Sequence, residues 1–144
     1  PDYTLGGHTI PVIYAISPLV LPRPAQWGRN IHMSGFWVDE ESKPFVPPRE
    51  LADFLAAGEK PVYIGFGSMV SGNMRKTFDV VMKAVRAAGL RVILDNGWSG
   101  AGLAGASNVF TLSSFVPHDW LFPQMRAVVH HGGAGTTAAV IFTA

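Results

Sequence analysis

From residue 48 onward the chain alternates short apolar segments with segments of helical periodicity, and this alternation constrains the fold most. Apolar runs that end in glycine or polar residues occupy 61–68, 91–97, 108–115 and 127–132. Helical patterns occupy 48–58, 73–89 and 117–125, and a further helix begins after 132. Strands that alternate with helices, and are apolar through most of their length, are typical of a parallel sheet covered on both faces. The sequence therefore predicts the α/β class: a Rossmann-like parallel sheet with flanking helices.

The first 47 residues have a different pattern. Strand-like segments at 9–17 and 30–39 flank the proline-bearing segment 18–28, which cannot be regular structure. The stretch 39–47 combines prolines with charged residues and is the predicted linker. We therefore expect 1–38 and 48–144 to belong to different domains.

Composition excludes several function classes. Of 144 residues, 48% are hydrophobic and 15% charged, which indicates a globular chain with a large core. The net charge of +1 does not indicate binding to nucleic acid or to an anionic membrane. The absence of cysteine excludes disulfides and thiolate chemistry. No apolar run approaches the roughly 20 residues of a membrane-spanning helix, so none is expected.

The two ends of the sequence lack the signals of a native start and of a helix end. The chain begins "PDYTL" without an initiator methionine and ends in the apolar "AAVIFTA" without a helix-stop signal. This pattern favours truncation at both ends.

Glycine and polar residues gather where the predicted strands end, which is the edge at which ligands bind in open α/β sheets. They are Gly65, Gly67 and Ser68; Asn96, Gly97 and Trp98; Ser113, Ser114 and Phe115; and His130 to Gly135. Their coincidence at four strand ends predicts a ligand site at that edge.

The segment "GFGSMVSGN" (65–73) fits neither common phosphate-binding motif. The dinucleotide fingerprint requires a third glycine where Val70 stands, and the P-loop requires a lysine where Asn73 stands. Two interpretations remain: a plain tight turn, or a turn in which Ser68 and nearby amides face an anion.

The segment "HHGGAGTT" (130–137) favours an anion site over a simple turn. Glycines let the backbone approach a ligand, and the following helix start offers unpaired N–H groups with Thr136 and Thr137 as hydroxyl donors. His131 can donate to a phosphate oxygen, whereas strand alternation turns His130 the other way. A metal site is weakly supported because adjacent histidines on a strand do not converge. A Ser-His-Asp triad is equally weak because no nucleophile elbow is present.

Aromatic and acidic residues near the same edge are weaker evidence for a ligand site than the segment 130–137. Trp98 and Phe115 are candidates to stack on a flat base, although aromatic residues are more often core. Asp95 and Asp119 are the only acidic residues in this part of the predicted site, so a paired-carboxylate hydrolase is not indicated.

Three segments together resemble UDP-dependent glycosyltransferases of the GT-B fold, in the sterol glucosyltransferase branch: "SPLVLPRPAQW…GFW", "VYIGFGSM" and "VPHDWLFPQMRAVVHHGGAGTT". The resemblance implies two Rossmann-like domains with a cleft between them. Residues 1–38 would be the end of the N-terminal acceptor domain, and 48–144 the first half of the nucleotide-sugar-binding domain. The implied reaction is a metal-independent, inverting transfer of a sugar, expected to be glucose, from a UDP-sugar to a lipophilic hydroxyl acceptor such as a sterol.

The resemblance assigns the diphosphate site residue by residue. His131 matches the histidine that contacts the diphosphate, and Ser68, beside Gly67, matches a small hydroxyl residue near the phosphates. The loop and helix start around the diphosphate are Gly133, Ala134, Gly135 and Thr136.

The resemblance also assigns the nucleobase site, although this sequence differs from the family pattern at some positions. Phe115 stands where plant relatives stack a tryptophan on uracil, the backbone of Val116 would contact the base edge, and Trp98 is a second candidate for the base or ribose. The acidic residue that holds the ribose in plant relatives would fall near Ala139 and is absent. The acidic pair that contacts the sugar lies beyond this sequence, and the catalytic histidine belongs to the acceptor domain. No catalytic residue and no metal site is therefore assigned to this chain, which is expected to be inactive alone.

The implied partners are a UDP-sugar as donor substrate, with no separate cofactor, and the lipophilic acceptor. The expected location is the cytoplasm, with peripheral membrane association open for the full-length protein. Because an incomplete domain exposes apolar surface, self-association is expected. Two alternatives stay open: a non-catalytic nucleotide-binding or assembly module, and a nucleotide-dependent reductase, which the failed dinucleotide fingerprint disfavours.

Overall fold

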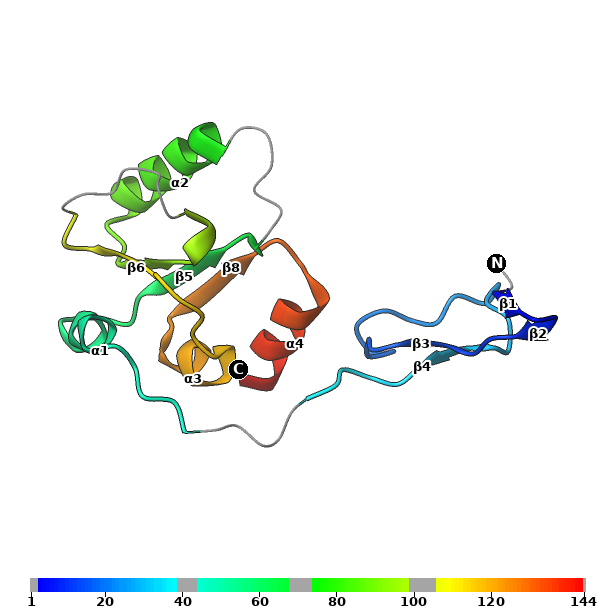
Figure 1. The fold of residues 1–144 in the computed structure, drawn as a ribbon. Helices are drawn as coiled ribbons and strands as arrows, with labels where there is room; N and C mark the ends of the chain where they lie inside the picture. Colours follow the sequence, from blue (N-terminus) through cyan, green and yellow to red (C-terminus); the bar gives the residue numbers. More distant parts are fainter. Residues whose placement is uncertain (1–2, 39–43, 68–73, 99–105, 144) are drawn as a thin grey trace. The chain divides into compact units, whose positions relative to one another are not determined.

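The computed structural model describes residues 3–38, 44–67, 74–98 and 106–143. The chain divides into two compact units, Pro1–Lys43 and Pro44–Ala144 (Figure 1). The division falls inside the stretch 39–47 that the sequence indicates as a linker, of which 39–43 lie outside the described residues. The assignment of the two segments to two domains of a larger protein stays a prediction.

The first unit contains two small pairs of strands. An antiparallel hairpin joins β1 (Thr4–Leu5) to β2 (His8–Thr9). Its two turn residues, Gly6 and Gly7, have φ of 57° and 80°, which suits the glycine-rich turn of a two-residue hairpin.

A parallel pair follows, formed by β3 (Val12–Tyr14) and β4 (Ile31–Met33). Both strands are shorter than the predicted segments 9–17 and 30–39. Pro11 precedes β3 and has no N–H to donate to a ladder, and Gly35, with φ of 82°, turns the chain soon after β4.

The second unit is built on a four-stranded parallel sheet. Its strands are β5 (Val62–Gly65), β6 (Val92–Leu94), β7 (Val109–Thr111) and β8 (Ala127–His130). They lie in the order β7-β6-β5-β8, and each neighbouring pair is parallel. The predicted α/β class with a parallel sheet and flanking helices is confirmed.

Helices cover the sheet and occupy the predicted segments (Figure 1). They are α1 (Arg49–Ala56), α2 (Met74–Ala88), α3 (His118–Leu121), which continues into the 3-10 turn η3 (Phe122–Gln124), and α4 (Ala134–Thr143). A second 3-10 turn, η2 (Asn96–Trp98), follows β6 and was not predicted. No helix in the described part of the chain combines the length and apolar character needed to cross a bilayer.

Strand alternation divides the core into two clusters, one on each face of the sheet. Tyr63 and Ile93 face a cluster that includes residues of α1, α3 and η3. Val62 and Val92 face the other cluster, which includes residues of α2. Burial on both faces explains why these strands are apolar at every position rather than at alternate ones.

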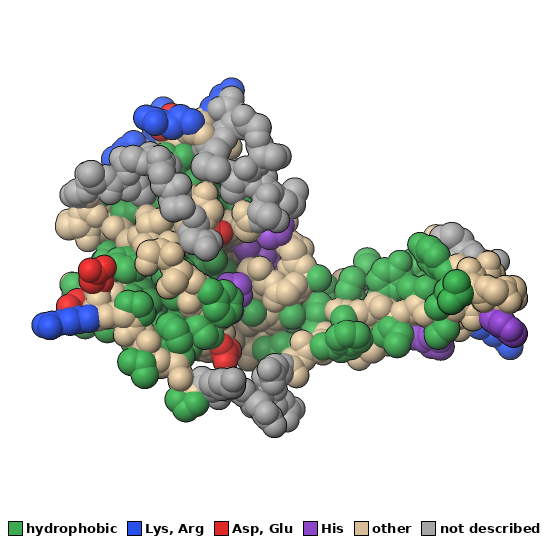
Figure 2. Space-filling model, in the orientation of Figure 1, with side chains coloured by type: hydrophobic (Ala, Val, Ile, Leu, Met, Phe, Trp, Pro, Cys, Tyr) green, Lys and Arg blue, Asp and Glu red, His purple; other side chains and the backbone are tan. Residues whose placement is uncertain are grey.

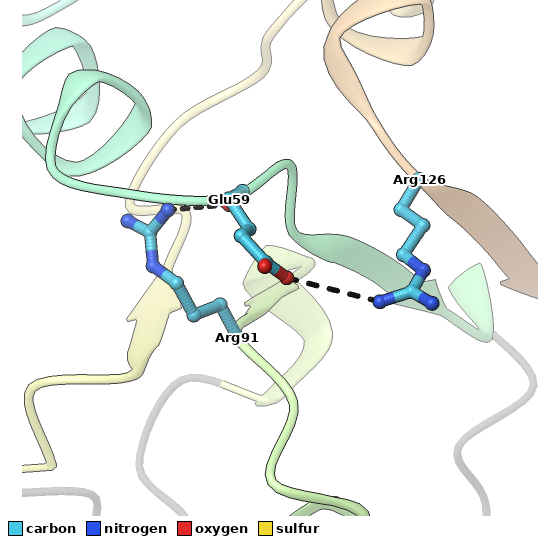
Figure 3. Close-up of polar contacts among 3 residues, drawn as sticks. All are labelled: Glu59, Arg91 and Arg126. Carbon is cyan, nitrogen blue, oxygen red and sulfur yellow. Dashed lines mark hydrogen bonds and ion pairs between the residues drawn. The ribbon is translucent and has the colours of Figure 1, made fainter.

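The starts of the strands are joined by a small polar network around Glu59 (Figure 3). Arg91, just before β6, donates to the backbone carbonyl of Glu59 at 2.5 Å, and the Glu59 carboxylate lies 3.9 Å from the guanidinium of Arg126, just before β8. Because the ion pair is largely exposed, its stabilising effect is small. The network links the strand starts and leaves the opposite edge free for a site.

Leu121, at the end of α3, provides a test of the first core cluster. It is 0% exposed, so we expect Leu121→Ala to lower the free energy of unfolding by about 2–5 kcal/mol through lost transfer energy and a residual cavity. Urea denaturation measures this. Leu19→Ala is the matched control, since Leu19 is 94% exposed and its truncation should change little. Equal effects of the two substitutions would contradict the described core.

Exposed apolar side chains favour self-association of the chain. Figure 2 shows hydrophobic side chains at the surface of the first unit. In the second unit, Val129, Ile141 and Phe142 are 43%, 49% and 57% exposed, and within the described residues β8 pairs with β5 alone. We expect sedimentation velocity to detect species larger than a monomer, and Phe142→Ser to reduce them. A monodisperse monomer would contradict this expectation.

Candidate functional site

The parallel register brings the ends of three strands to one edge of the sheet. Ile64 pairs with Leu94, and Gly65 pairs with His130. The residues that follow therefore emerge side by side from β5, β6 and β8. The ends of these three strands, which the sequence indicates one by one as candidate ligand-binding positions, thus lie at one edge of the sheet.

A pocket of ≈ 190 Å³ opens at this edge. It is lined by Tyr63, Gly65, Gly67, Asp95, Leu112, Ser114, Phe115, Val116, His118 and Thr136. Gly67, Phe115, Val116 and Thr136 are among the residues predicted from sequence as ligand contacts. Their role in binding stays a prediction, but the structure brings them around one cavity.

His131 lies against two glycines of this surface. A Cβ atom added to Gly133 would stand 2.6 Å from the His131 Nε2, and one added to Gly67 would stand 3.1 Å from its Cε1. Gly67 also has φ of 55°, which disfavours any other residue. In the structure both glycines leave room for the imidazole of His131, and their contact with a ligand stays a prediction.

His130 has a local structural role. Its Nδ1 accepts a hydrogen bond from the backbone N–H of Gly132 at 3.2 Å, and Gly132 has φ of 83°. The ring therefore supports the turn between β8 and α4. The two adjacent histidines do different things, as strand alternation predicts.

The start of α4 presents unpaired backbone donors. The helix begins at Ala134, and the N–H of Thr137 donates to the carbonyl of Gly133 at 2.9 Å. The N–H groups of Ala134, Gly135 and Thr136 precede that first intrahelical bond and have no helical acceptor. Together with the positive end of the helix dipole they form a surface suited to an anion.

Asp95 lines the pocket and is not among the contact residues predicted from the sequence. It follows β6, is 7% exposed, and accepts the N–H of Gly67 on Oδ2 and of Gly97 on Oδ1, both at 3.1 Å. Burial raises its pKa above the ordinary 3.8, although the amides and the charge of His131 act in the opposite direction. The signal in the sequence is a carboxylate directly after a buried strand, followed two residues later by glycine.

Aromatic rings form another wall of the pocket. Phe115 is 76% exposed, and His118 stacks on Phe122 with ring centroids 4.4 Å apart and planes 14° apart. Burial, followed by the charge of Asp95, raises the pKa of Tyr63 to about 12, so it stays a neutral phenol. Burial lowers the pKa of His118, against the opposing charges of Asp119 and Asp95. The wall is therefore aromatic and uncharged at neutral pH.

Trp98, one of the predicted contact residues, lies in the core. Trp98 is 1% exposed and packs on Phe66 and Phe78, with ring centroids 5.6 Å apart in both pairs. The turn η2 carries its ring into the second core cluster, so the ring does not face the pocket, contrary to its assignment to the base or ribose. Ser68 lies outside the described residues.

Metal ligands do not cluster in the described part of the chain. No group of three or more His, Cys, Asp or Glu residues is placed to hold an ion there. The polar groups around the pocket are instead backbone N–H, hydroxyl and imidazole groups, with the single buried carboxylate of Asp95. Such donors suit an anion better than a cation.

Curated proteins similar to this chain include several sterol 3-beta-glucosyltransferases. No protein-family model matches the chain. A sterol 3-beta-glucosyltransferase of Arabidopsis thaliana is 44% identical over 135 residues, which are 93% of this chain and 21% of the relative. A second one from the same plant is 41% identical over 132 residues, 90% of this chain and 21% of the relative. A sterol 3-beta-glucosyltransferase of Saccharomyces cerevisiae is 37% identical over 150 residues, 95% of this chain and 12% of the relative. The chain thus spans 12–21% of the length of these relatives.

The lowered pKa of His118 predicts a pH dependence of stability. Because the folded state favours the neutral imidazole, protonation favours the unfolded chain. This contribution is fully present above the ordinary pKa of 6.5 and is lost as the pH falls below that value toward the folded-state pKa. We expect the free energy of unfolding, measured with urea between about pH 7.5 and 5, to fall more steeply in the unmodified chain than in His118→Phe, which keeps the ring stacking. Parallel curves would contradict the prediction.

Proposed function

The chain is homologous to a segment of the sterol 3-beta-glucosyltransferases, which are UDP-dependent glycosyltransferases of the GT-B fold, and we propose that it forms part of the donor site of such an enzyme. In this proposal the parent protein transfers glucose from UDP-glucose to the hydroxyl of a sterol. The UDP-sugar is a substrate, and no separate cofactor or metal takes part. A cytoplasmic location, peripheral to the membrane that holds the sterol, belongs to the same proposal.

The diphosphate site is the part of the proposal that the geometry supports best. His131 lies beside Gly67 at the end of β5 and beside Gly133, the residue before α4. Its imidazole and the first N–H groups of α4 therefore stand on the same small surface. A diphosphate placed there would accept from both, and the hydroxyl of Thr136 lines the adjoining pocket. This convergence of His131 with the start of α4 is the observation that carries the proposed function.

The nucleobase is proposed to lie on the aromatic side of the pocket. Phe115 is exposed and lines the cavity beside Val116. A flat base stacked on Phe115 would bring its edge to the backbone of Val116, which follows directly in the chain. Trp98 is left out of this proposal because its ring is in the core.

The chemical role of this segment is to stabilise the leaving group. In an inverting displacement the acceptor oxygen attacks the sugar carbon while the bond to the diphosphate breaks, and the electron pair stays on the diphosphate. Donors fixed around that diphosphate bind the developing charge more strongly than the ground state and so lower the barrier. No residue of this chain is proposed as the base that removes the acceptor proton.

The test is calorimetric titration of the chain with UDP, UDP-glucose and NAD. We expect UDP and UDP-glucose to bind and NAD not to bind, since Val70 replaces the third glycine of the dinucleotide fingerprint. Binding of NAD in preference to UDP would favour a nucleotide-dependent reductase. UDP binding without glucosyl transfer to a sterol by the parent protein would favour a non-catalytic nucleotide-binding module.

His131→Ala tests the diphosphate assignment in the same titration. Loss of one charge-assisted hydrogen bond should weaken UDP binding by roughly 1.5–3 kcal/mol. His32→Ala is the matched control because His32 is an exposed histidine of β4, in the other unit. An affinity unchanged by His131→Ala would remove His131 from the site.

A further inference from the structure

Asp95 bridges the ends of two strands through its two carboxylate oxygens. Oδ2 accepts from the Gly67 N–H and Oδ1 from the Gly97 N–H, both at 3.1 Å. The backbone N–H of Asp95 itself donates to the carbonyl of Ile64 at 3.2 Å. The carboxylate thus joins the turn after β5 to the turn after β6, and each oxygen has an N–H partner from a different segment.

Keeping this carboxylate buried costs stability at neutral pH. Burial raises the pKa of Asp95, and the N–H groups of Gly67, Gly97 and Phe66 together with the charge of His131 offset this only in part. A folded-state pKa above the unfolded value means that folding becomes less favourable as the pH rises from the ordinary 3.8 through the folded value. A carboxylate whose pKa is raised by burial and which lines a pocket is a candidate for a functional role.

The surroundings of Asp95 specify what the charge does. Among the described residues, the titratable groups that interact with it are Tyr63 from β5, His118 from α3 and His131 from the turn after β8. Of these, a charged His131 attracts the Asp95 carboxylate. The His131 ring also lies against Gly67, whose N–H donates to that carboxylate. A carboxylate repels a diphosphate, but both oxygens of Asp95 accept N–H groups that stabilise part of its negative charge.

We propose that Asp95 is a positioning residue of the diphosphate site, which holds the Gly67 turn beneath the imidazole of His131 and keeps that imidazole oriented as a donor. The inference rests on the proposed function, because it assigns Asp95 to the same UDP site. It adds a residue that contacts neither the diphosphate nor the sugar. Asparagine at this position would keep the size of the side chain but offer one acceptor oxygen instead of two and no charge.

The test compares Asp95→Asn with Asp119→Asn by calorimetric titration with UDP over a range of pH. Asp119 is the matched control, because it is an exposed aspartate of α3 outside the pocket lining. We expect Asp95→Asn to weaken UDP binding about tenfold to a hundredfold near neutral pH, the scale of a lost charged hydrogen bond. The difference in UDP affinity between Asp95→Asn and the control should narrow as the pH falls and Asp95 becomes protonated, because a protonated aspartate is uncharged like asparagine.

Each outcome separates this inference from the proposed function. If the unmodified chain does not bind UDP, both are overturned. If it binds UDP and Asp95→Asn binds equally well, the positioning role is overturned and the proposed function stands. An affinity lowered by the same factor at every pH would indicate a purely structural role and would also overturn the inference.

Gly97→Ala provides a second variant in case Asp95→Asn does not fold. A Cβ atom at Gly97 would stand 3.1 Å from the Asp95 Oδ1 and 3.4 Å from the Gly67 carbonyl oxygen, so it would displace the carboxylate without changing its charge. We expect a severalfold loss of UDP affinity. An affinity equal to that of the unmodified chain would overturn the inference.

Discussion

The parallel pairing of β5 with both β6 and β8 is the constraint on which the rest of the second unit depends. It directs the chain after each of these strands to the same edge of the sheet. It also requires both faces to be covered, since Val62 and Tyr63 are both buried although they point to opposite faces. Most polar residues around the pocket therefore lie at or beyond the strand ends, where the chain segments meet.

At that edge the backbone, rather than other side chains, holds the polar side chains. Gly67 and Gly133 leave the space that the His131 ring occupies, and Gly97 leaves the space for the carboxylate of Asp95. Asp95 in turn accepts N–H groups of two of these glycines. Side chains fixed by backbone contacts on a rigid sheet lose little entropy when a ligand binds, which is how preorganised sites gain affinity.

The sequence predicted the sheet and the helices because local periodicity encodes them, and the pocket lies at the sheet edge where the predicted contact residues gather. The first-unit strands were predicted too long, since apolar residues extend beyond the paired positions on both sides, while Pro11 precedes β3 and Gly35 turns the chain soon after β4. Trp98 was assigned to the ligand because the turn η2, which directs its ring into the core, has no clear local signal. Asp95 was not assigned because its hydrogen bond to the Gly67 N–H joins residues 28 apart in the sequence, which local patterns do not predict.

The charge of the pocket lining explains why positioning matters so much at this site. No lysine or arginine is among the described residues that line the pocket, and one aspartate is. A diphosphate bound beside this aspartate would be neutralised by N–H groups, a hydroxyl and one imidazole. The strength of such hydrogen bonds depends strongly on the angle between donor and acceptor. A point charge such as lysine tolerates a displaced ligand, whereas aligned N–H donors do not. If a diphosphate binds at this edge, as we propose, its affinity would depend on the orientation of these donors, and the residues that fix the Gly67 turn and the His131 ring would contribute without contacting the ligand.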